Sequence, residues 1–335
     1  GNLMKPYLTE GFVGSTHLNA TGITEILKLL PAYLKLFGDI IRLIRTQRPD
    51  AVIFVDNPGL NLRIAGRIAG LNIPMFYYIC PQVWAWHSER VHKLKKWFRS
   101  LYVIFEFEKD FFDKHQTESI FVGHPLAAQM SGFLPKAQPR PASGRLKQIL
   151  LLPGSRAHEI RRLLPDMLSA VSKLKQTGEN PEFSVIEIET VPKTLYDRLL
   201  SGYPEIKRLD QKNKYETFLD ADIAICCSGT VTLECAMLGL PMIIINKSSW
   251  LTAQIARRVL TIEYLGLPNL LASETICPEL LQENCTGENI SQELIKYLKD
   301  PELVKKTSVK LTEITKPLSE HDAPKQTAAD VLTRL

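Results

Sequence analysis

The stretch Gln148–Arg156 (QILLLPGSR) decides the fold class of this 335-residue chain. It begins with an almost unbroken apolar run, Gln148–Leu152, which is typical of a strand in a parallel sheet covered on both faces. A Pro-Gly-Ser turn follows, and a helical pattern then spans 159–174. A strand, a tight polar turn and a helix form one βα unit, so the stretch predicts an α/β protein.

Similar βα units recur in both directions from this stretch. Repeated units of this kind imply right-handed crossovers and doubly wound parallel sheets. Buried strands are expected at 50–56, 74–80, 101–105, 119–122, 148–152, 183–188, 222–227 and 241–246. Helices are expected at 60–69, 159–174 and 231–240, and near the end of the chain at 301–315 and 323–335.

One segment, 131–146 (SGFLPKAQPRPASGRL), has almost no periodicity and concentrates proline and glycine. This composition is typical of a linker, and a new strand is expected immediately after it. A length of 335 residues corresponds to about two domains. We therefore expect two α/β domains of similar size, 1–140 and 141–315, joined near residue 140.

The composition is that of an ordinary globular protein, because 45% of the residues are hydrophobic and 23% are charged. Disordered, collagen-like and disulfide-stapled classes are excluded. The net charge of +5 is too small to argue for a nucleic-acid partner. The 6 cysteines form no CxxC pair and are expected to be buried free thiols of a reducing compartment.

The sequence shows neither a membrane-spanning segment nor a secretory signal. No apolar run approaches the ~18 residues of a membrane span. The first residues lack the basic and apolar regions of a signal peptide. A cytosolic protein is therefore expected, and contact with a membrane surface from the side stays open.

The loop 55–61 (VDNPGLN) places a carboxylate at the end of an apolar strand. In open parallel sheets, ligands bind at the carboxyl ends of the strands, so Asp56 is a candidate general base. Aspartate is equally favoured in turns and at helix caps. The spacing alone leaves both interpretations open.

The turn Gly154-Ser155-Arg156 has the composition of a phosphate-binding loop. Its glycine permits close approach of the backbone, and the next helix offers free N–H groups. Arg156 adds a forked cation that suits a phosphate. The alternative is a plain strand-to-helix turn with a surface arginine.

A second loop of this kind, 228–234 (SGTVTLE), also joins a strand to a helix. Ser228 and Thr230 supply hydroxyls, and Gly229 lets backbone N–H groups face a ligand. Glu234 lies one helical turn beyond Thr230, where its carboxylate could accept hydrogen bonds from a ribose diol. The two loops together favour a nucleotide site in the second domain, and the alternative is a capping box with a surface glutamate.

Aromatic residues and cations occur together at 84–99. Such a cluster can indicate nucleic acid, but a single short run more often forms the rim of an anionic-ligand site or a solvated helix face. His124 and His158 stand alone, without metal-ligand spacing. We expect neither a nucleic-acid partner nor a metal.

The segment 23–44 forms an apolar helical stripe with an unusually wide arc, and Pro31 is expected to break it into two pieces. Lys28 and Lys35 lie beside it. A wide arc flanked by cations suits a membrane-surface patch, whereas a helix buried on two sides would give the same pattern. The membrane interpretation expects part of the following side chains to be exposed: Ile26, Leu29, Leu30, Tyr33, Leu36 and Phe37.

Seven segments of the chain match those of one known family, in the same order: 54–61 (FVDNPGLN), 80–86 (CPQVWAW), 122–125 (VGHP), 151–159 (LLPGSRAHE), 228–234 (SGTVTLE), 267–272 (LPNLLA) and 278–283 (PELLQE). The chain resembles the lipid-A-disaccharide synthase family over essentially its whole length. The combination of VWAW, LLPGSR and LPNLLA is highly specific to that family.

The resemblance implies a GT-B fold, with two Rossmann-like, doubly wound domains facing a cleft. A C-terminal helix at 316–335 is expected to return to the first domain. The family transfers 2,3-diacylglucosamine from its UDP derivative to 2,3-diacylglucosamine 1-phosphate, with inversion and without a metal or other cofactor. The products are UDP and the β(1→6) lipid A disaccharide 1-phosphate. Residues 1–140 would then bind the acceptor and the membrane, and 141–315 the UDP-sugar donor.

The resemblance also implies a peripheral protein on the cytoplasmic face of the inner membrane, and it leaves a homodimer open. Carried over by position, the family's essential aspartate falls on Asp56 and its essential arginine on Arg156. The implied UDP site consists of Gly154, Ser155, Arg156, Ser228, Gly229, Thr230, Glu234 and Asn269, with Gln282 and Glu283 close by.

The sequence departs from the family pattern in two places. Family members begin with a strand and a Gly/Ser-rich loop, so the first domain is expected to lack about one βα unit of ~30 residues. Gly59 stands where the family carries a second acid. The alternative functions are a non-catalytic UDP-sugar-binding fragment and another GT-B enzyme that uses UDP-N-acetylglucosamine.

Overall fold

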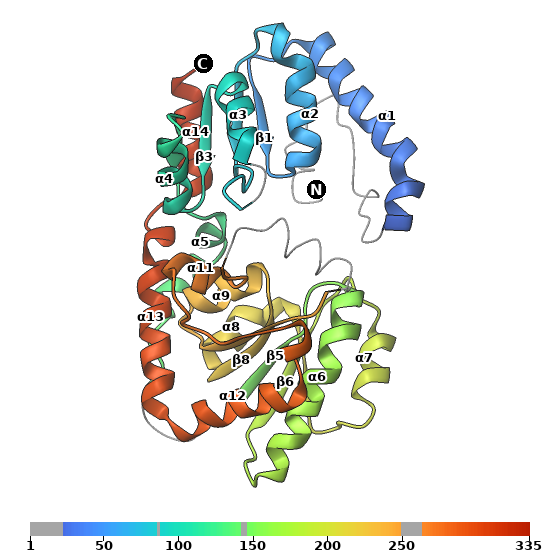
Figure 1. Ribbon diagram of the computed structural model, residues 1–335, viewed down its shortest axis with the longest axis vertical. Helices are drawn as coiled ribbons and strands as arrows, with labels where there is room; N and C mark the ends of the chain where they lie inside the picture. The colour runs from blue at the N-terminus through green and yellow to red at the C-terminus, as the bar shows by residue number, and fades with distance from the viewer. Residues whose placement is uncertain (1–22, 86–87, 142–145, 249–262) are drawn as a thin grey trace. The chain divides into compact units, whose positions relative to one another are not determined.

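The computed structural model describes residues 23–85, 88–141, 146–248 and 263–335, with only the backbone at 23–30 (Figure 1). The chain divides into two compact units. Unit 1 extends to Val122 and includes Pro324–Leu335, whereas unit 2 spans Gly123–Ala323. Each unit contains one parallel sheet with helices packed on it, so the predicted α/β class is confirmed.

Unit 1 is built on a four-stranded parallel sheet in the order β1-β2-β3-β4. Its core is aromatic, and the ring centroids of Tyr77 and Phe98 lie 5.1 Å apart. The predicted apolar runs are its strands: β1 (Val52–Val55), β2 (Met75–Tyr78), β3 (Ser100–Val103) and β4 (Ile120–Phe121). Its helices are α1 (Ile23–Gln47), α2 (Pro58–Ile68), α3 (Val91–Trp97), α4 (Glu106–Lys114) and α14 (Ala323–Thr333).

Unit 2 is built on a six-stranded parallel sheet in the order β10-β9-β8-β5-β6-β7. Its strands are β5 (Gln148–Leu152), β6 (Glu182–Glu187), β7 (Lys207–Asp210), β8 (Ile223–Cys227), β9 (Met242–Asn246) and β10 (Glu279–Leu281). Its helices are α5 (Pro125–Gln129), α6 (Ala157–Gln176), α7 (Lys193–Leu200), α8 (Lys214–Asp220), α9 (Thr230–Met237), α11 (Leu267–Ala272), α12 (Gly287–Lys299) and α13 (Pro301–Ser319).

The two strands that the sequence did not predict, β7 and β10, form the edges of this sheet. Central strands such as β8 are buried along their whole length and read as apolar runs. In β7 (KRLD) every residue is at least partly exposed, and β10 has only 3 residues. Edge strands of this kind leave no hydrophobic signal.

The end of the chain returns to unit 1, as the fold prediction required. The hydroxyl of Tyr102 on β3 donates a hydrogen bond to Asp330 of α14, at 2.8 Å. Arg334 forms an ion pair with Glu118, at 3.1 Å. These contacts join residues more than 200 positions apart in the sequence and hold α14 on the first unit.

The segment predicted as a linker, 131–146, lies in unit 2, and the unit boundary falls at Gly123. Residues 142–145 are outside the described part of the chain. Arg140 attaches this segment to unit 2, because its guanidinium donates to the carbonyls of Phe218, Ala221 and Leu238. A buried arginine with such a complete set of acceptors fixes the segment instead of leaving it a loose connection.

The helix α1 runs without a break through Pro31, so the predicted division into two pieces is wrong. A proline removes one backbone hydrogen bond, and the exposed position of Pro31 lets water satisfy the freed group. Of the six side chains of which part was expected to be exposed, Leu36 is buried, at 7% exposure. Tyr33 and Phe37 are half-buried, whereas the neighbouring Leu34 is 62% exposed.

The side chains of Ile26, Lys28, Leu29 and Leu30 lie outside the described residues, so their predicted exposure is untested. Within the described residues, no helix combines the length and the apolar character needed to cross a membrane.

Candidate functional site

The turns after β5 and β8 bring most of the predicted site residues together. These strands are neighbours, with Leu152 beside Cys226, so the turns that follow them lie at the same edge of the sheet. A pocket of about 360 Å³ opens between the turns. Its lining includes the predicted residues Gly154, Ser155, Arg156, Ser228, Gly229, Thr230 and Glu234.

The turn after β5 is held by Glu159, a residue that the sequence analysis did not single out. Its Oε2 accepts hydrogen bonds from the backbone N–H groups of Ser155 and Arg156, at 2.8 and 3.1 Å. Its Oε1 pairs with Nη1 of Arg156 at 3.2 Å. A glutamate three residues after the helix cap is the sequence signal for this arrangement.

Glu159 thus occupies the amides that were predicted to face a phosphate. The backbone of Gly154 has a φ of 120°, and a Cβ at this position would lie 2.5 Å from Oε2 of Glu159. Only glycine fits this close approach. An incoming diphosphate therefore meets a turn whose N–H groups already hold a carboxylate, while Arg156 remains exposed.

The turn after β8 leaves its backbone open toward the pocket. The Ser228 hydroxyl donates to the carbonyl of Leu265 at 3.0 Å. A Cβ added to Gly229 would meet no atom within 4 Å. The first N–H groups of α9 follow directly at Thr230, and such groups have no acceptor within their own helix. This turn can therefore offer backbone donors to an anion.

Glu234 is held by two side chains of α8 that the sequence analysis also missed. Its Oε1 accepts from Nζ of Lys214 at 2.8 Å and from the hydroxyl of Tyr215 at 3.2 Å. The Lys214 ammonium lies 4.6 Å from the centroid of the Tyr215 ring. Burial, together with the adjacent carboxylate, raises the pKa of Tyr215, so its hydroxyl stays protonated and donates.

The second oxygen of Glu234 has no partner among the described residues, although the residue is only 7% exposed. A carboxylate oxygen that lacks a donor at the wall of a pocket is a strong acceptor for the hydroxyl of a ligand. Nothing in the local sequence connects 214 and 215 with 234, because the contact depends on how α8 packs beside α9.

Asn269, Gln282 and Glu283 do not line this pocket. Asn269 is fully buried, and its amide donates to the carbonyl of Cys277 and to Glu279 while accepting from the N–H groups of Ile276 and Cys277. Its hydrogen-bonding capacity is used inside unit 2. In this arrangement Asn269 organises the loop before β10 and does not present its amide to a ligand.

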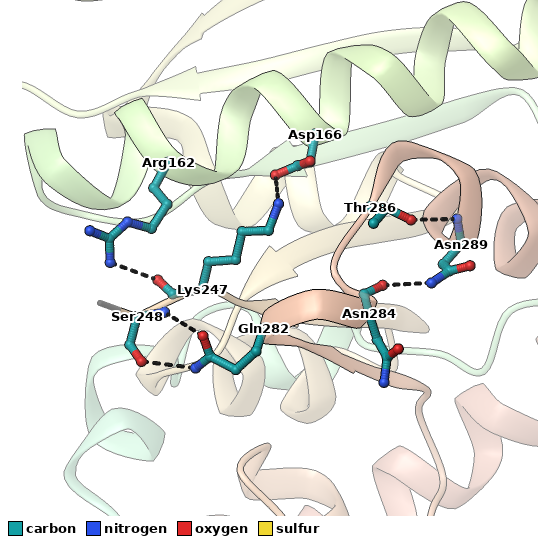
Figure 2. A network of polar contacts seen from close by, with 8 residues as sticks. All are labelled: Arg162, Asp166, Lys247, Ser248, Gln282, Asn284, Thr286 and Asn289. Carbon is teal, nitrogen blue, oxygen red and sulfur yellow. Dashed lines mark hydrogen bonds and ion pairs between the residues drawn. The ribbon is translucent and has the colours of Figure 1, made fainter. Parts of the chain in front are cut away.

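Figure 2 shows where Gln282 lies instead. Its carbonyl accepts from the backbone N–H of Ser248 at 3.2 Å, and its NH₂ group donates to the Ser248 hydroxyl at 2.8 Å. Next to it, Lys247 pairs with Asp166 of α6 at 2.5 Å. This network ties the ends of β9 and β10 to α6, so Gln282 is fixed within unit 2.

Asp56 lies at the carboxyl end of β1 in unit 1, as predicted, and it is exposed. Its backbone is left-handed, with a φ of 48°, and the next residue, Asn57, has a φ of 43°. The Asp56 carbonyl accepts from the hydroxyl of Tyr77 at 2.7 Å and from the Asn61 amide at 2.6 Å. Within the described residues, no donor reaches its carboxylate, which leaves that group available as a base.

The neighbouring strand ends on a second unusual residue, Ile79, with a φ of 57°. A left-handed conformation is strained for a β-branched side chain, and strain of this kind clusters at functional sites. Because Val55 of β1 is in register with Tyr78 of β2, this strain lies next to Asp56. The left-handed residues after β1 and β2 therefore indicate that the carboxyl ends of these strands are the functional edge of the sheet in unit 1.

Glu108 is a buried carboxylate of unit 1, and the sequence analysis missed it as well. It accepts from the indole N–H of Trp84 at 2.9 Å and from the backbone N–H groups of Ile104 and Phe105. Burial raises its pKa to about 7. These bonds hold Trp84, one residue of the VWAW motif, in place, so this part of the motif stabilises the fold. Trp86 and His87 lie outside the described residues.

The remaining side chains with predicted chemistry are the cysteines and the isolated histidines. The 6 cysteines are all free and buried, so that prediction is confirmed. His124 caps α5 by accepting from the N–H of Leu126, and burial lowers its pKa to about 4. Among the described residues, no group of histidine, cysteine or carboxylate side chains could hold a metal ion.

The two parallel α/β units, with a polar pocket at the strand ends of unit 2, define a protein of the GT-B class. Solved structures support this fold. The UDP-GlcNAc 2-epimerase of Neisseria meningitidis bound to UDP-GlcNAc has a TM-score of 0.57 at 13% identity, with 91% of this chain and 82% of that chain covered. The S. aureus MnaA-UDP co-structure has a TM-score of 0.54 at 12% identity, with 87% and 76% covered.

The chain belongs to the lipid-A-disaccharide synthetase family, whose model matches residues 1–331. It is 32% identical to a lipid-A-disaccharide synthase of Geobacter metallireducens over 100% of this chain and 88% of the relative. It is 36% identical to lipid-A-disaccharide synthase 1 of Legionella pneumophila over 92% of this chain and 81% of the relative. The protein is therefore a glycosyltransferase of lipid A disaccharide synthesis, with a UDP-sugar and a lipid acceptor as substrates, and the alternative functions are not favoured.

Proposed function

We propose that the pocket of unit 2 binds UDP-2,3-diacylglucosamine and that Asp56 activates the acceptor, 2,3-diacylglucosamine 1-phosphate. The observation that carries the proposal is the convergence of the turns after β5 and β8, together with Glu234, on one pocket of about 360 Å³. A site for a nucleoside diphosphate requires two kinds of group: donors of hydrogen bonds to the phosphates and an acceptor of hydrogen bonds from the ribose hydroxyls.

In the proposed site, Arg156 and the first N–H groups of α9 hold the diphosphate. As the bond between the sugar and UDP breaks, negative charge grows on the leaving phosphate, and fixed donors stabilise it without reorganisation. The free oxygen of Glu234 accepts a hydrogen bond from the ribose. Glu159 keeps Arg156 in place at 3.2 Å and must share the Ser155 and Arg156 amides with the ligand or give them up.

Asp56 acts as the general base. It removes the proton from the 6′-hydroxyl of the acceptor while that oxygen attacks the anomeric carbon, and UDP leaves from the opposite face with inversion. The base must come within about 3 Å of the hydroxyl in the bound state. Its exposed carboxylate, free of any donor among the described residues, supports this role.

We further propose that the protein works as a peripheral protein on the cytoplasmic face of the inner membrane. Both substrates are acylated, so the enzyme must reach lipid in a bilayer. The exposed Leu34 and the adjacent Lys35 on α1 support contact with anionic headgroups, which attract each cation by about 1 kcal/mol.

The function is tested by a transfer assay with both purified substrates, together with calorimetry of UDP binding. Formation of the disaccharide 1-phosphate, with UDP bound by the wild-type protein, is the expected result. UDP binding without any disaccharide would instead indicate a UDP-sugar-binding protein.

A further inference from the structure

Unit 1 contains a groove of about 650 Å³. It lies between α1, α2 and α3, and its apolar surface comes from side chains such as Leu34, Phe37 and Trp97. Among the described residues, the cations that line it are Arg63, Arg67, Arg90 and Lys93, and no carboxylate lines it. The groove therefore combines an apolar surface with several cations.

Three cations of this groove have no acidic partner among the described residues. Within the described residues, Arg63, Arg67 and Lys93 are exposed and form no ion pair or hydrogen bond. Arg67 lies over the ring of Phe37, with its Cζ 6.0 Å from the centroid, so its guanidinium is held at the apolar surface. Several cations around one concavity repel one another, and an anionic ligand would relieve that repulsion.

The apolar surface is formed by close packing of α3 on α2. A Cβ added to Gly66 would lie 3.1 Å from the Trp97 ring, so the indole lies directly against the backbone of α2. Leu34, on the α1 side of the groove, is 62% exposed. An exposed leucine beside two half-buried aromatic side chains is the kind of apolar surface that marks a contact site.

The groove begins beside the proposed base. Pro58 and Gly59, which follow Asp56 and Asn57, line one end, and Arg67 lines the far part. The helix α2 rises about 14 Å between residues 58 and 67, at 1.5 Å per residue. This length is comparable with that of an extended fatty acyl chain. Arg63 and Arg67 lie one turn apart on the same face of α2 and present two guanidinium groups along the groove.

We propose that this groove binds the acceptor of the transfer, with Arg63 and Arg67 holding its phosphate and the apolar surface holding an acyl chain. The inference rests on the proposed role of Asp56. Guanidinium groups suit a phosphate because they donate two parallel hydrogen bonds to it. An acylated sugar phosphate carries both an anionic group and an acyl chain, which matches the two kinds of surface in the groove. Arg63 and Arg67 are thus binding residues for the acceptor.

The test is a kinetic comparison of two acceptors in neutral detergent micelles, 2,3-diacylglucosamine 1-phosphate and the same compound without its phosphate. In the double variant Arg63→Met/Arg67→Met, we expect the KM for the phosphorylated acceptor to rise about 10- to 100-fold, the range for losing hydrogen bonds to a charged group. The KM for the UDP-sugar should not change, and the kcat/KM for the unphosphorylated acceptor should stay at the wild-type value.

Arg42→Met/Arg45→Met is the matched control, because both arginines are exposed on α1, outside the groove lining, and the variant loses the same two charges. An unchanged KM for the phosphorylated acceptor in the double variant overturns the proposal. An equal loss with both acceptors also overturns it. A loss that appears only on vesicles containing anionic phospholipid, and not in neutral micelles, would assign the groove to membrane docking instead.

The experiments give different results if the groove does not bind the acceptor and if the proposed function is wrong. If Asp56→Asn is inactive while the double arginine variant behaves as wild type, the result supports Asp56 as the base and excludes the groove as the acceptor site. If the wild-type protein makes no disaccharide, the proposed function itself falls. An unchanged thermal unfolding midpoint and donor KM in the double variant show that its fold is intact.

Discussion

The pocket of unit 2 and the groove of unit 1 differ in how their charges are compensated. In the pocket, Glu159 already bonds to two amides and Arg156, and Glu234 already bonds to Lys214 and Tyr215. Among the described residues, no carboxylate lines the groove, and Arg63, Arg67 and Lys93 form no ion pair. The pocket is therefore organised before any ligand binds, whereas these three cations rely on a ligand for the balancing charge.

This difference fits the two substrates of the family. The nucleotide part of the donor is chemically constant, and prearranged partners reduce the entropy lost on binding it. An acylated acceptor is long and conformationally variable, so a broad apolar surface with cations suits it better. The following predictions test this contrast, in order of decreasing expected effect.

The largest effect is expected at Asp56. Asp56→Asn keeps the shape of the side chain but removes the base, so turnover should fall about 10²- to 10⁴-fold while the Kd for UDP stays the same. Steady-state turnover and calorimetry with UDP provide the two measurements. Asp110→Asn, an exposed carboxylate on α4, is the control. Retention of more than roughly a tenth of wild-type turnover would exclude the general-base role.

Arg156→Ala should lower kcat/KM for the UDP-sugar by about 10²- to 10³-fold, because one fixed positive charge on the leaving group is lost. Arg156→Lys should recover only part of this loss, since an ammonium cannot form the forked contact. Arg161→Ala removes an exposed arginine from the same helix and should have no effect. A lysine variant equal to wild type would mean that only a generic positive charge is needed.

Tyr215→Phe should weaken UDP binding about fivefold, because one hydrogen bond that orients Glu234 is lost. The decisive comparison uses UDP and its 2′- and 3′-deoxy analogues. If Tyr215 acts through Glu234 on the ribose, the variant should lose affinity for UDP but not for the analogue that lacks the contacted hydroxyl. Tyr203→Phe removes a hydroxyl that bonds to Ser172 outside the pocket and serves as the control. An equal loss with every ligand would indicate a general packing defect.

The smallest effect is expected at Glu159. Its carboxylate occupies amides that a diphosphate would use, so Glu159→Gln should bind UDP about two- to fivefold more tightly by removing a like charge. Its affinity for uridine, which has no phosphate, should stay constant. The same change weakens the cap of α6, which costs stability of about 1 kcal/mol. Weaker UDP binding would show that Glu159 supports the phosphate site and does not compete for it.

Much of the fold could be read directly from the sequence. The apolar runs at 148–152, 222–227 and 241–246 predict the central strands because strands covered on both faces need continuous hydrophobic residues. The strand-end turns around Gly154 and Gly229 also follow from local composition, because glycine and small polar residues are what such turns require. These features depend on neighbours in the chain, so the sequence alone determined them.

Other features were decided only by the tertiary structure. No local pattern indicates that Lys214 and Tyr215 meet Glu234, or that α3 lies against Gly66 and closes one side of a groove. The burial of Leu36 and the exposure of Leu34 were not predictable either, because a wide apolar arc does not say which part of it faces the core. Local propensities fix strands and turns through short-range sterics and hydrogen bonds. The partners of a charged side chain depend instead on packing between segments far apart in sequence, and that packing settles which charges are paired and which stay open to a ligand.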